Sequence, residues 1–218
     1  MDRPIITVPR GLFGMRTSDW DIDWREQTAG TSTSGKRKIL IGKLPRWVGA
    51  PSLVFRPHLL RQWRAHRWAG RGLTAVFRIT MVDGFTMPQQ PAIPFEGGIT
   101  FADGAGWDSA PAAPCVGGAA PGDTSIVLDE SDAPAEIAVG QILSHADWPF
   151  GVVSREALGD GLVRLGLEMP VRSVIPDGAF VDLTGVGLFE AVNPNAGNPE
   201  HGVNRIARTS MRLQEWLR

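Results

Sequence analysis

The sequence predicts a mainly β protein: a β-sandwich with one packed α-helix, plus an inserted small β-barrel or β-sandwich domain. Three observations predict this fold. Residues 19–24 alternate strictly between Asp and apolar side chains, which is typical of a strand with one buried face. Residues 57–69 carry apolar side chains at helical spacing. Beyond residue 120, short apolar runs alternate with Gly-Asp and Asp-Gly pairs that favour tight turns.

The composition fits this class. The chain has 218 residues, enough for one large domain or two small ones with a sizeable core. Lys and Arg total 22 against 23 Asp and Glu, so the net charge of -1 gives no whole-protein reason to expect a nucleic-acid or acidic-membrane partner. The start of the chain lacks the apolar segment of a signal peptide, and no run approaches the roughly 18 apolar residues of a membrane helix. We therefore expect neither secretion by that route nor a membrane span.

The first strand, residues 19–24, places Trp20, Ile22 and Trp24 on one face and three aspartates on the other. The Thr, Ser and Gly-rich stretch 28–35 is typical of a flexible loop. A basic run follows the loop and leads into the apolar residues 39–41: Lys36, Arg37 and Lys38. Together these segments predict a long, exposed hairpin arm.

A short amphipathic helix is expected at about 57–69. Pro57 suits a first helical position, and Gly70 and Gly72 close the helix. The residues near helical spacing are Leu59, Leu60, Trp63 and Arg67. Residues 73–82 then resume β character, with alternate apolar side chains on one face.

A change of composition marks the domain boundary. Residues 85–120 are rich in Pro and Gly, which predicts a linker or a set of loops. Short strands follow at 125–128, 137–143, 150–155, 162–167 and 179–183. We therefore expect a β-rich domain at 85–185, with its linker at 85–120, inserted into a first domain formed by 1–84 and 186–218. The alternating stretch 203–216 fits a returning strand or a short helix, and we favour a strand that completes the first sheet.

Motifs for catalysis, cofactor binding or metal binding are not recognisable, and we expect a protein without enzymatic activity. Asp19, Asp21 and Asp23 lack the glycine and the glutamate that a calcium loop places after them. Cys115 is the only cysteine and has no basic neighbour to lower the pKa of its thiol. The four histidines have no zinc-binding spacing: His58, His66, His145 and His201.

Positive charge is concentrated in two places, the basic run of the hairpin arm and the helix. Arginines interleaved with Trp63 and Trp68 could stack on nucleic acid, but the balanced total charge favours a solvated or subunit-facing side. The candidate contact residues for a subunit or partner are Lys36, Arg37, Lys38, Arg61, Arg64 and Arg67.

The order of these features resembles the distal tail protein family of long-tailed, siphovirus-like bacteriophages and related tail-tip structural proteins. The resemblance covers most of the chain through short motifs. They are residues 9–14, the Asp-Trp strand 19–24, Trp63 followed by 70–73, then 137–143, 161–170 and 178–181.

The resemblance implies a virion protein, made in the host cytoplasm, whose copies form a hexameric ring around the tail channel. It implies contacts with the tail tube protein, the hub protein and the tape-measure protein. It implies no cofactor, no membrane partner, and DNA only as cargo passing through the channel. The chain has no room for the C-terminal carbohydrate-binding domain of some members, so direct binding of host sugars is not implied.

Two alternatives from other classes stay open. A glycan-binding β-sandwich module or glycan hydrolase could stack sugar rings on Trp107 and Trp148, which we place in loops. An enzyme whose site assembles from dispersed Asp and His residues is the other alternative.

Overall fold

The computed structural model is mainly β with one α-helix, as the sequence predicts. It describes residues 3–12, 15–17, 19–31, 37–40, 44–71, 73–83, 111–193, 195, 197–201 and 206–218. The chain divides into two compact units. The first consists of Met1–Asp83 and Leu188–Arg218, and the second of Gly84–Gly187. The sequence had suggested 1–84 with 186–218, and 85–185.

The first unit contains a six-stranded sheet in the order β1-β8-β15-β18-β6-β3. Its strands are β1 (Ile5–Thr7), β8 (Val76–Thr80), β15 (Val186–Ala191), β18 (Leu213–Glu215), β6 (Arg46–Gly49) and β3 (Asp21–Asp23). β1 runs parallel to β8, and the β15-β18-β6-β3 pairings are antiparallel.

A four-stranded sheet completes this unit in the order β16-β17-β7-β2. Its strands are β16 (Glu200–His201), β17 (Ala207–Ser210), β7 (Ser52–Phe55) and β2 (Met15–Thr17). β6 continues into β7, and β17 continues into β18. The two continuous segments pair with each other in both sheets: β17 with β7 in the four-stranded sheet, and β18 with β6 in the six-stranded sheet. The single strand expected at 203–216 is therefore divided into β17 and β18, because the paired segments bend from one sheet into the other.

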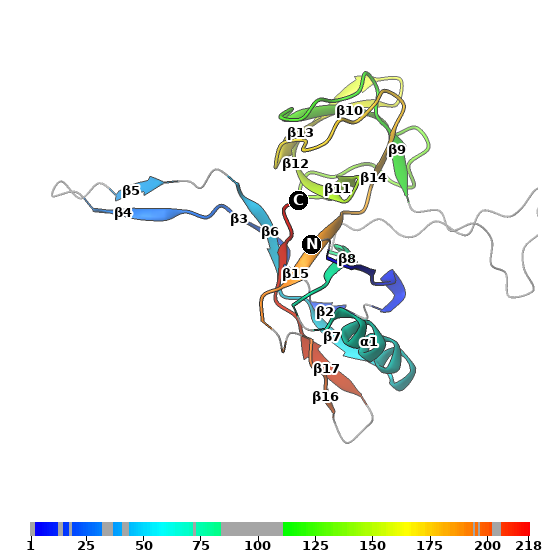
Figure 1. Cartoon of the computed structure of the whole chain (residues 1–218). Coiled ribbons are helices and arrows are strands. Elements are labelled where there is room, and N and C mark those ends of the chain that lie inside the picture. Colours follow the sequence, from blue (N-terminus) through cyan, green and yellow to red (C-terminus); the bar gives the residue numbers. More distant parts are fainter. Residues whose placement is uncertain are drawn as a thin grey trace, which may run out of the picture. The chain divides into compact units, whose positions relative to one another are not determined.

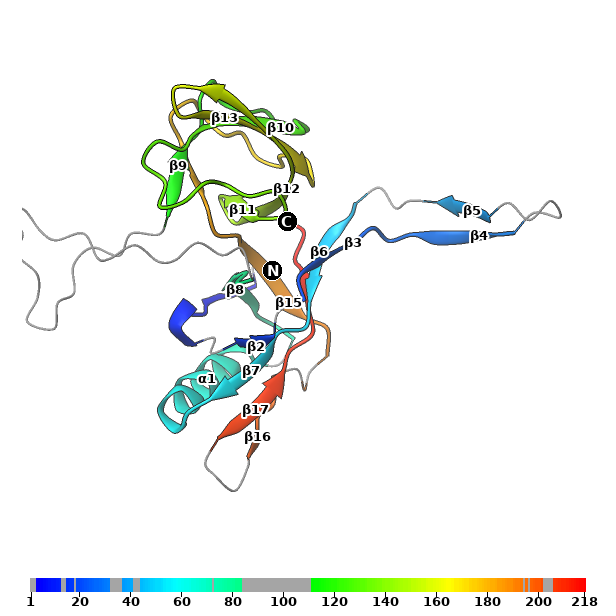
Figure 2. The same cartoon turned by 180° about the vertical axis from the view of Figure 1, so that it is seen from behind.

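Helix α1 (Pro57–Gly70) packs against β7, β1 and the short 3-10 turn η1 (Arg10–Leu12) (Figures 1 and 2). Trp63 is completely buried and anchors the helix: its ring stacks on Phe55 with the centroids 5.5 Å apart. Its Nε1 donates a hydrogen bond to the carbonyl oxygen of Gly197, 2.8 Å away. The helix ends at Gly70, and Arg71 follows in the left-handed region with φ 44°.

The hairpin arm contains β4 (Gln27–Thr31) and β5 (Arg37–Leu40), which form a two-stranded antiparallel sheet of their own (Figure 1). The prediction of a loop at 28–35 is therefore wrong for residues 28–31, which belong to strand β4. The β-branched Thr28 and Thr31 extend readily, and cross-strand pairing uses that tendency. Residues 32–36 lie outside the described residues.

Strand β3 forms the end of the six-stranded sheet among the described strands. Trp20 packs on Phe189 with ring centroids 5.0 Å apart, so the apolar face of the segment points toward the core. Asp19 and Asp21 are exposed on the other face. The predicted separation of the two faces is therefore partial, because Asp23 is half-buried like Ile22 and Trp24, and the strand is shorter than 19–24.

The second unit is a closed antiparallel barrel in the order β10-β13-β12-β11-β14-β9. Its strands are β9 (Ala112–Pro114), β10 (Ser125–Asp129), β11 (Ile142–His145), β12 (Trp148–Gly159), β13 (Leu162–Glu168) and β14 (Phe180–Asp182). The two end strands, β9 and β10, meet and close the barrel. Cys115 forms an antiparallel β-bridge with Leu128, and the Val116 amide donates a hydrogen bond to the Val127 carbonyl oxygen at 2.8 Å. The Leu183 amide donates to the Pro111 carbonyl at 2.8 Å, so the chain enters and leaves the barrel at one point.

In β9, β10, β13 and β14 every second residue is buried, as expected for strands with one face toward a core. Fully or almost fully buried side chains include Ile126, Leu128, Val163, Leu165 and Val181. The linker expected at 85–120 ends earlier than we predicted, because β9 and the bridge at Cys115 lie within the sheet; residues 85–110 lie outside the described residues. The strand expected at 137–143 begins only at Ile142, because Gly140 turns with φ 91°.

An ion pair holds the N-terminal segment to the first sheet. Arg3 donates to Glu190 at 2.6 Å and also to three backbone carbonyls of the loop after α1, those of Leu73, Thr74 and Ala75. Burial alone would raise the pKa of Glu190. Hydrogen bonds from Arg3 and Gln214, with the charges of Arg3 and Arg46, outweigh burial and lower that pKa below its ordinary value.

This pKa shift predicts a pH-dependent contribution to stability. Because the folded-state pKa is lowered, the stabilisation is complete above the ordinary pKa of 4.5 and is lost as the pH falls through the folded value. We expect Glu190→Gln to cost about 1–2 kcal/mol at neutral pH. The difference from wild type should shrink on acidification. Urea unfolding between pH 7 and pH 3 measures it, with the exposed Glu156→Gln as the control. A difference that grows on acidification would contradict this assignment.

Candidate functional site

The structure places the predicted contact residues in two elements that share no sheet. Arg37 and Lys38 lie in β5, and Lys36 lies outside the described residues. Arg61 and Arg64 are exposed on α1, where Arg64 lies over the ring of Trp68, 4.8 Å from its centroid. The two basic groups therefore lie on different elements, β5 and α1.

Arg67 takes a different position from its two helix neighbours. It is half-buried and donates to the side-chain oxygen of Asn198 at 3.1 Å. Burial lowers the pKa of its guanidinium from the ordinary value. This contact connects the predicted basic helix to a polar groove that the sequence analysis did not identify.

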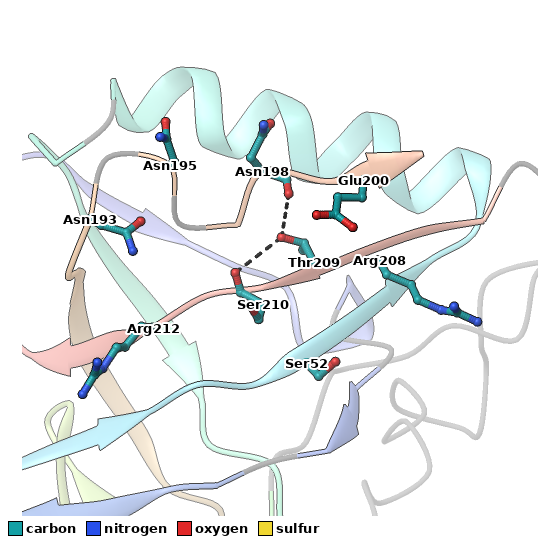
Figure 3. Close-up of a pocket in the computed structure, with 9 residues that line it drawn as sticks. All are labelled: Ser52, Asn193, Asn195, Asn198, Glu200, Arg208, Thr209, Ser210 and Arg212. Atoms are coloured by element: carbon teal, nitrogen blue, oxygen red, sulfur yellow. Dashed lines mark hydrogen bonds between the residues drawn. The ribbon is translucent and has the colours of Figure 1, made fainter. Parts of the chain in front are cut away.

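The floor of the polar groove is a row of exposed side chains from β17 and from residues 211–212, which follow it. From Ala207 to Leu213 the side chains alternate strictly between buried and exposed, which brings Arg208, Ser210 and Arg212 to one face. Ser52 of β7 lies opposite Ser210 in the strand register. The groove has a volume of about 520 Å³ and polar side chains throughout (Figure 3): Ser52, Asn193, Asn195, Asn198, Glu200, Arg208, Thr209, Ser210 and Arg212.

One wall of the groove is the loop after β15, which carries three asparagines. Hydrogen bonds fasten this loop to the row below: Gly197 N–H to Ser210 O at 3.0 Å, Val192 N–H to Arg212 O at 3.0 Å, and Thr209 Oγ1 to Asn198 O at 2.9 Å. The indole of Trp63 adds its bond to Gly197 from below. A Cβ on Gly197, which has φ 73°, would lie 2.7 Å from Trp63 Cζ2, so the close approach requires glycine. The wall is thus held in place before any ligand arrives.

The electrostatics of the groove are positive at both ends. In Figure 3, Arg208 and Arg212 lie at opposite ends of the row, and the asparagine side chains lie along one side of it. Glu200 stands directly across from Arg208 in the strand register, yet neither arginine forms an ion pair with any described residue. Guanidinium groups bind carboxylates and phosphates in a bidentate manner, and side-chain amides bind peptide groups. The groove suits an extended ligand that carries negative charge.

The remaining sequence candidates occupy structural positions. Cys115 is completely buried at the barrel closure, where burial raises the pKa of its thiol and the charge of Asp177 raises it further, against a backbone hydrogen bond from Gly118 that lowers it. Trp148 has the guanidinium of Arg172 over its ring, 5.1 Å from the centroid, so that ring face is not open to a sugar. Trp107 lies outside the described residues.

The part of the chain that the structure describes was also considered for a metal centre and for a membrane-spanning helix, and it contains neither. No three His, Cys, Asp or Glu side chains of that part of the chain gather closely enough to hold a metal ion. No helix there has the length and apolar character needed to cross a membrane.

The signal for the groove was present in the sequence but incomplete. The alternation at 207–213 was visible and predicted a strand. The asparagine wall comes from residues 193–198, and nothing local indicates that this loop folds over β17.

Comparison with known proteins adds no relative: no protein-family model matches the chain, and no curated protein sequence matches it.

Proposed function

We propose that the protein is a non-enzymatic structural component of a phage tail tip, a ring that joins the tail tube to the hub. The observation that carries the proposal is the discontinuous layout. A two-sheet body with one covering helix is interrupted by a closed barrel. This is the arrangement that the resemblance to distal tail proteins implies, and it goes with the matching motifs at 9–14, 19–24 and 70–73.

The first unit has features suited to self-assembly. Strands β1 and β3 end the six-stranded sheet among the described strands, and open edges can pair with or pack against another chain. The β4–β5 hairpin forms a separate sheet of its own (Figure 1). An arm of this kind can clasp a neighbouring subunit.

The barrel has a surface suited to attaching a neighbouring protein. Phe180 pairs with Pro114 across β14 and β9, so both side chains lie on the same outer face, and Val116 follows two residues later. Phe180 is 66% exposed and Val116 is 40% exposed. An exposed aromatic ring among apolar neighbours is typical of a protein contact. This patch is our candidate contact for the hub or another tail protein.

Labelling of intact particles tests the location. An antibody against the barrel, visualised by electron microscopy on phage particles from a host that carries this coding sequence, should bind at the distal end of the tail. Particles that contain no detectable copy by peptide mass spectrometry would contradict the proposal.

A further inference from the structure

The charged residues that line the polar groove of the first unit are two arginines and one glutamate, which together carry a net charge of +1. Arg208 and Arg212 are exposed and have no ion pair within the described chain, and the single carboxylate of the groove, Glu200, lies beside only one of them. The hydrogen-bonded wall keeps the site open without a ligand. Two arginines without an ion pair among the described residues, beside a wall of side-chain amides, form a suitable surface for an acidic strand.

The spacing of the charges defines the shape of such a strand. Arg208 and Arg212 are four residues apart, which separates their Cα atoms by at most about 13 Å. Asp19 and Asp21 are two residues apart, so their Cα atoms are separated by about 7 Å, and the long, flexible side chains of the two arginines can converge on carboxylates at that separation. A strand that carries carboxylates at this repeat can meet both arginines.

The acidic segment of this chain is available for such a contact. β3 is at the end of its sheet among the described strands, and its apolar face is occupied by the packing of Trp20 on Phe189. Asp19 and Asp21 are exposed, and each uses one oxygen locally, for the amides of Ala50 and Ile22. The second oxygen of each remains available. Asp23 faces Arg46 across the β3–β6 pair, so we expect it to contribute least.

We propose that the acidic face of β3 in one copy of this chain docks in the Arg208–Arg212 groove of the next copy. This inference rests on the proposed ring. The two surfaces belong to different sheets of one chain, so the contact is head-to-tail and repeats until the ring closes. Carboxylates of Asp19 and Asp21 bind the two guanidinium groups. The amides of Asn193, Asn195 and Asn198 bind the backbone at the open edge of β3.

Charge reversal on each side separately provides the test. The groove variant carries Arg208→Glu and Arg212→Glu, and the strand variant carries Asp19→Lys and Asp21→Lys in the full chain. Each variant alone places like charges at every contact, so we expect assembly to need at least 100-fold more protein than the wild type. In an equimolar mixture every contact between unlike copies is again complementary. The mixture should therefore assemble into alternating rings near the wild-type concentration, as measured by native mass spectrometry.

Two controls separate folding from contact. Each variant should keep the melting temperature of the wild type. The milder pair Asp19→Asn with Asp21→Asn keeps an oxygen for the Ala50 amide, and should weaken assembly at least tenfold without loss of folding.

The outcomes distinguish the two proposals. A wild-type chain that stays monomeric would overturn the ring and this contact together. If both charge-reversal variants form rings at the protein concentration that the wild type needs, the proposed contact is wrong and the proposed ring is not affected. Variants that fail alone and also fail as a folded mixture would show that the two surfaces are not partners.

Discussion

Trp63→Ala should lower the free energy of unfolding of the first unit by about 3–5 kcal/mol, the usual cost of removing a large buried aromatic side chain. Trp63 is completely buried, stacks on Phe55 and holds the Gly197 carbonyl through its indole nitrogen. The substitution leaves a cavity under α1 and removes the bond below the groove wall. Chemical denaturation followed by circular dichroism measures the loss.

Trp68→Ala is the matched control on the same helix. Its ring is 67% exposed and contacts Arg64, so its loss should cost about 1 kcal/mol or less. Equal costs for the two tryptophans would contradict the assignment of Trp63 as the anchor of the helix.

Leu165→Ala should lower the free energy of unfolding of the barrel by about 2–5 kcal/mol. Leu165 is completely buried, and β13 pairs on both sides, opposite Ile126 and Arg155. Leu158→Ala removes the same atoms from the neighbouring strand β12, where the side chain is 41% exposed, and should cost less than about 1 kcal/mol. Calorimetry of both variants compares the two positions.

The two buried substitutions also test the division of the chain. Each compact unit has its own buried core, so unfolding is expected in two transitions. Trp63→Ala should move one transition and Leu165→Ala the other. A single transition that both substitutions shift equally would contradict two separately folding units.

The sequence predicted the elements whose side chains obey a local period. Helix α1 was visible because Leu60 and Trp63 face the core at helical spacing. The barrel strands were visible as short apolar runs between turn pairs, and residues of these runs such as Val163 and Leu165 are buried. Turn pairs such as Asp160-Gly161, both with positive φ, marked the strand ends correctly.

The features that the sequence missed depend on contacts between distant segments. Residues 28–31 have the composition of a loop, and pairing with β5 makes them a strand. The bend that divides β17 from β18 follows from the matching bend between β7 and β6, which lie more than 150 residues earlier. The groove combines Ser52, the loop 193–198 and the row 208–212, and only the tertiary fold brings these three together.

The basic residues illustrate the same limit. Arg61, Arg64 and Arg67 have similar local surroundings in the sequence, yet only Arg67 contacts Asn198 at the polar groove. Burial of its guanidinium depends on that loop, which follows 131 residues later. Charge density along the chain therefore pointed to the helix and not to the groove in which we propose that copies meet.

The most direct measurement of the central claim is the mass of the purified full chain by native mass spectrometry at increasing protein concentration. The proposal predicts a closed assembly of six copies of the 23.6 kDa chain. The same sample should show rings with a central channel by electron microscopy. A chain that stays monomeric at every concentration, and forms no ring beside tail tube or hub proteins, would contradict it.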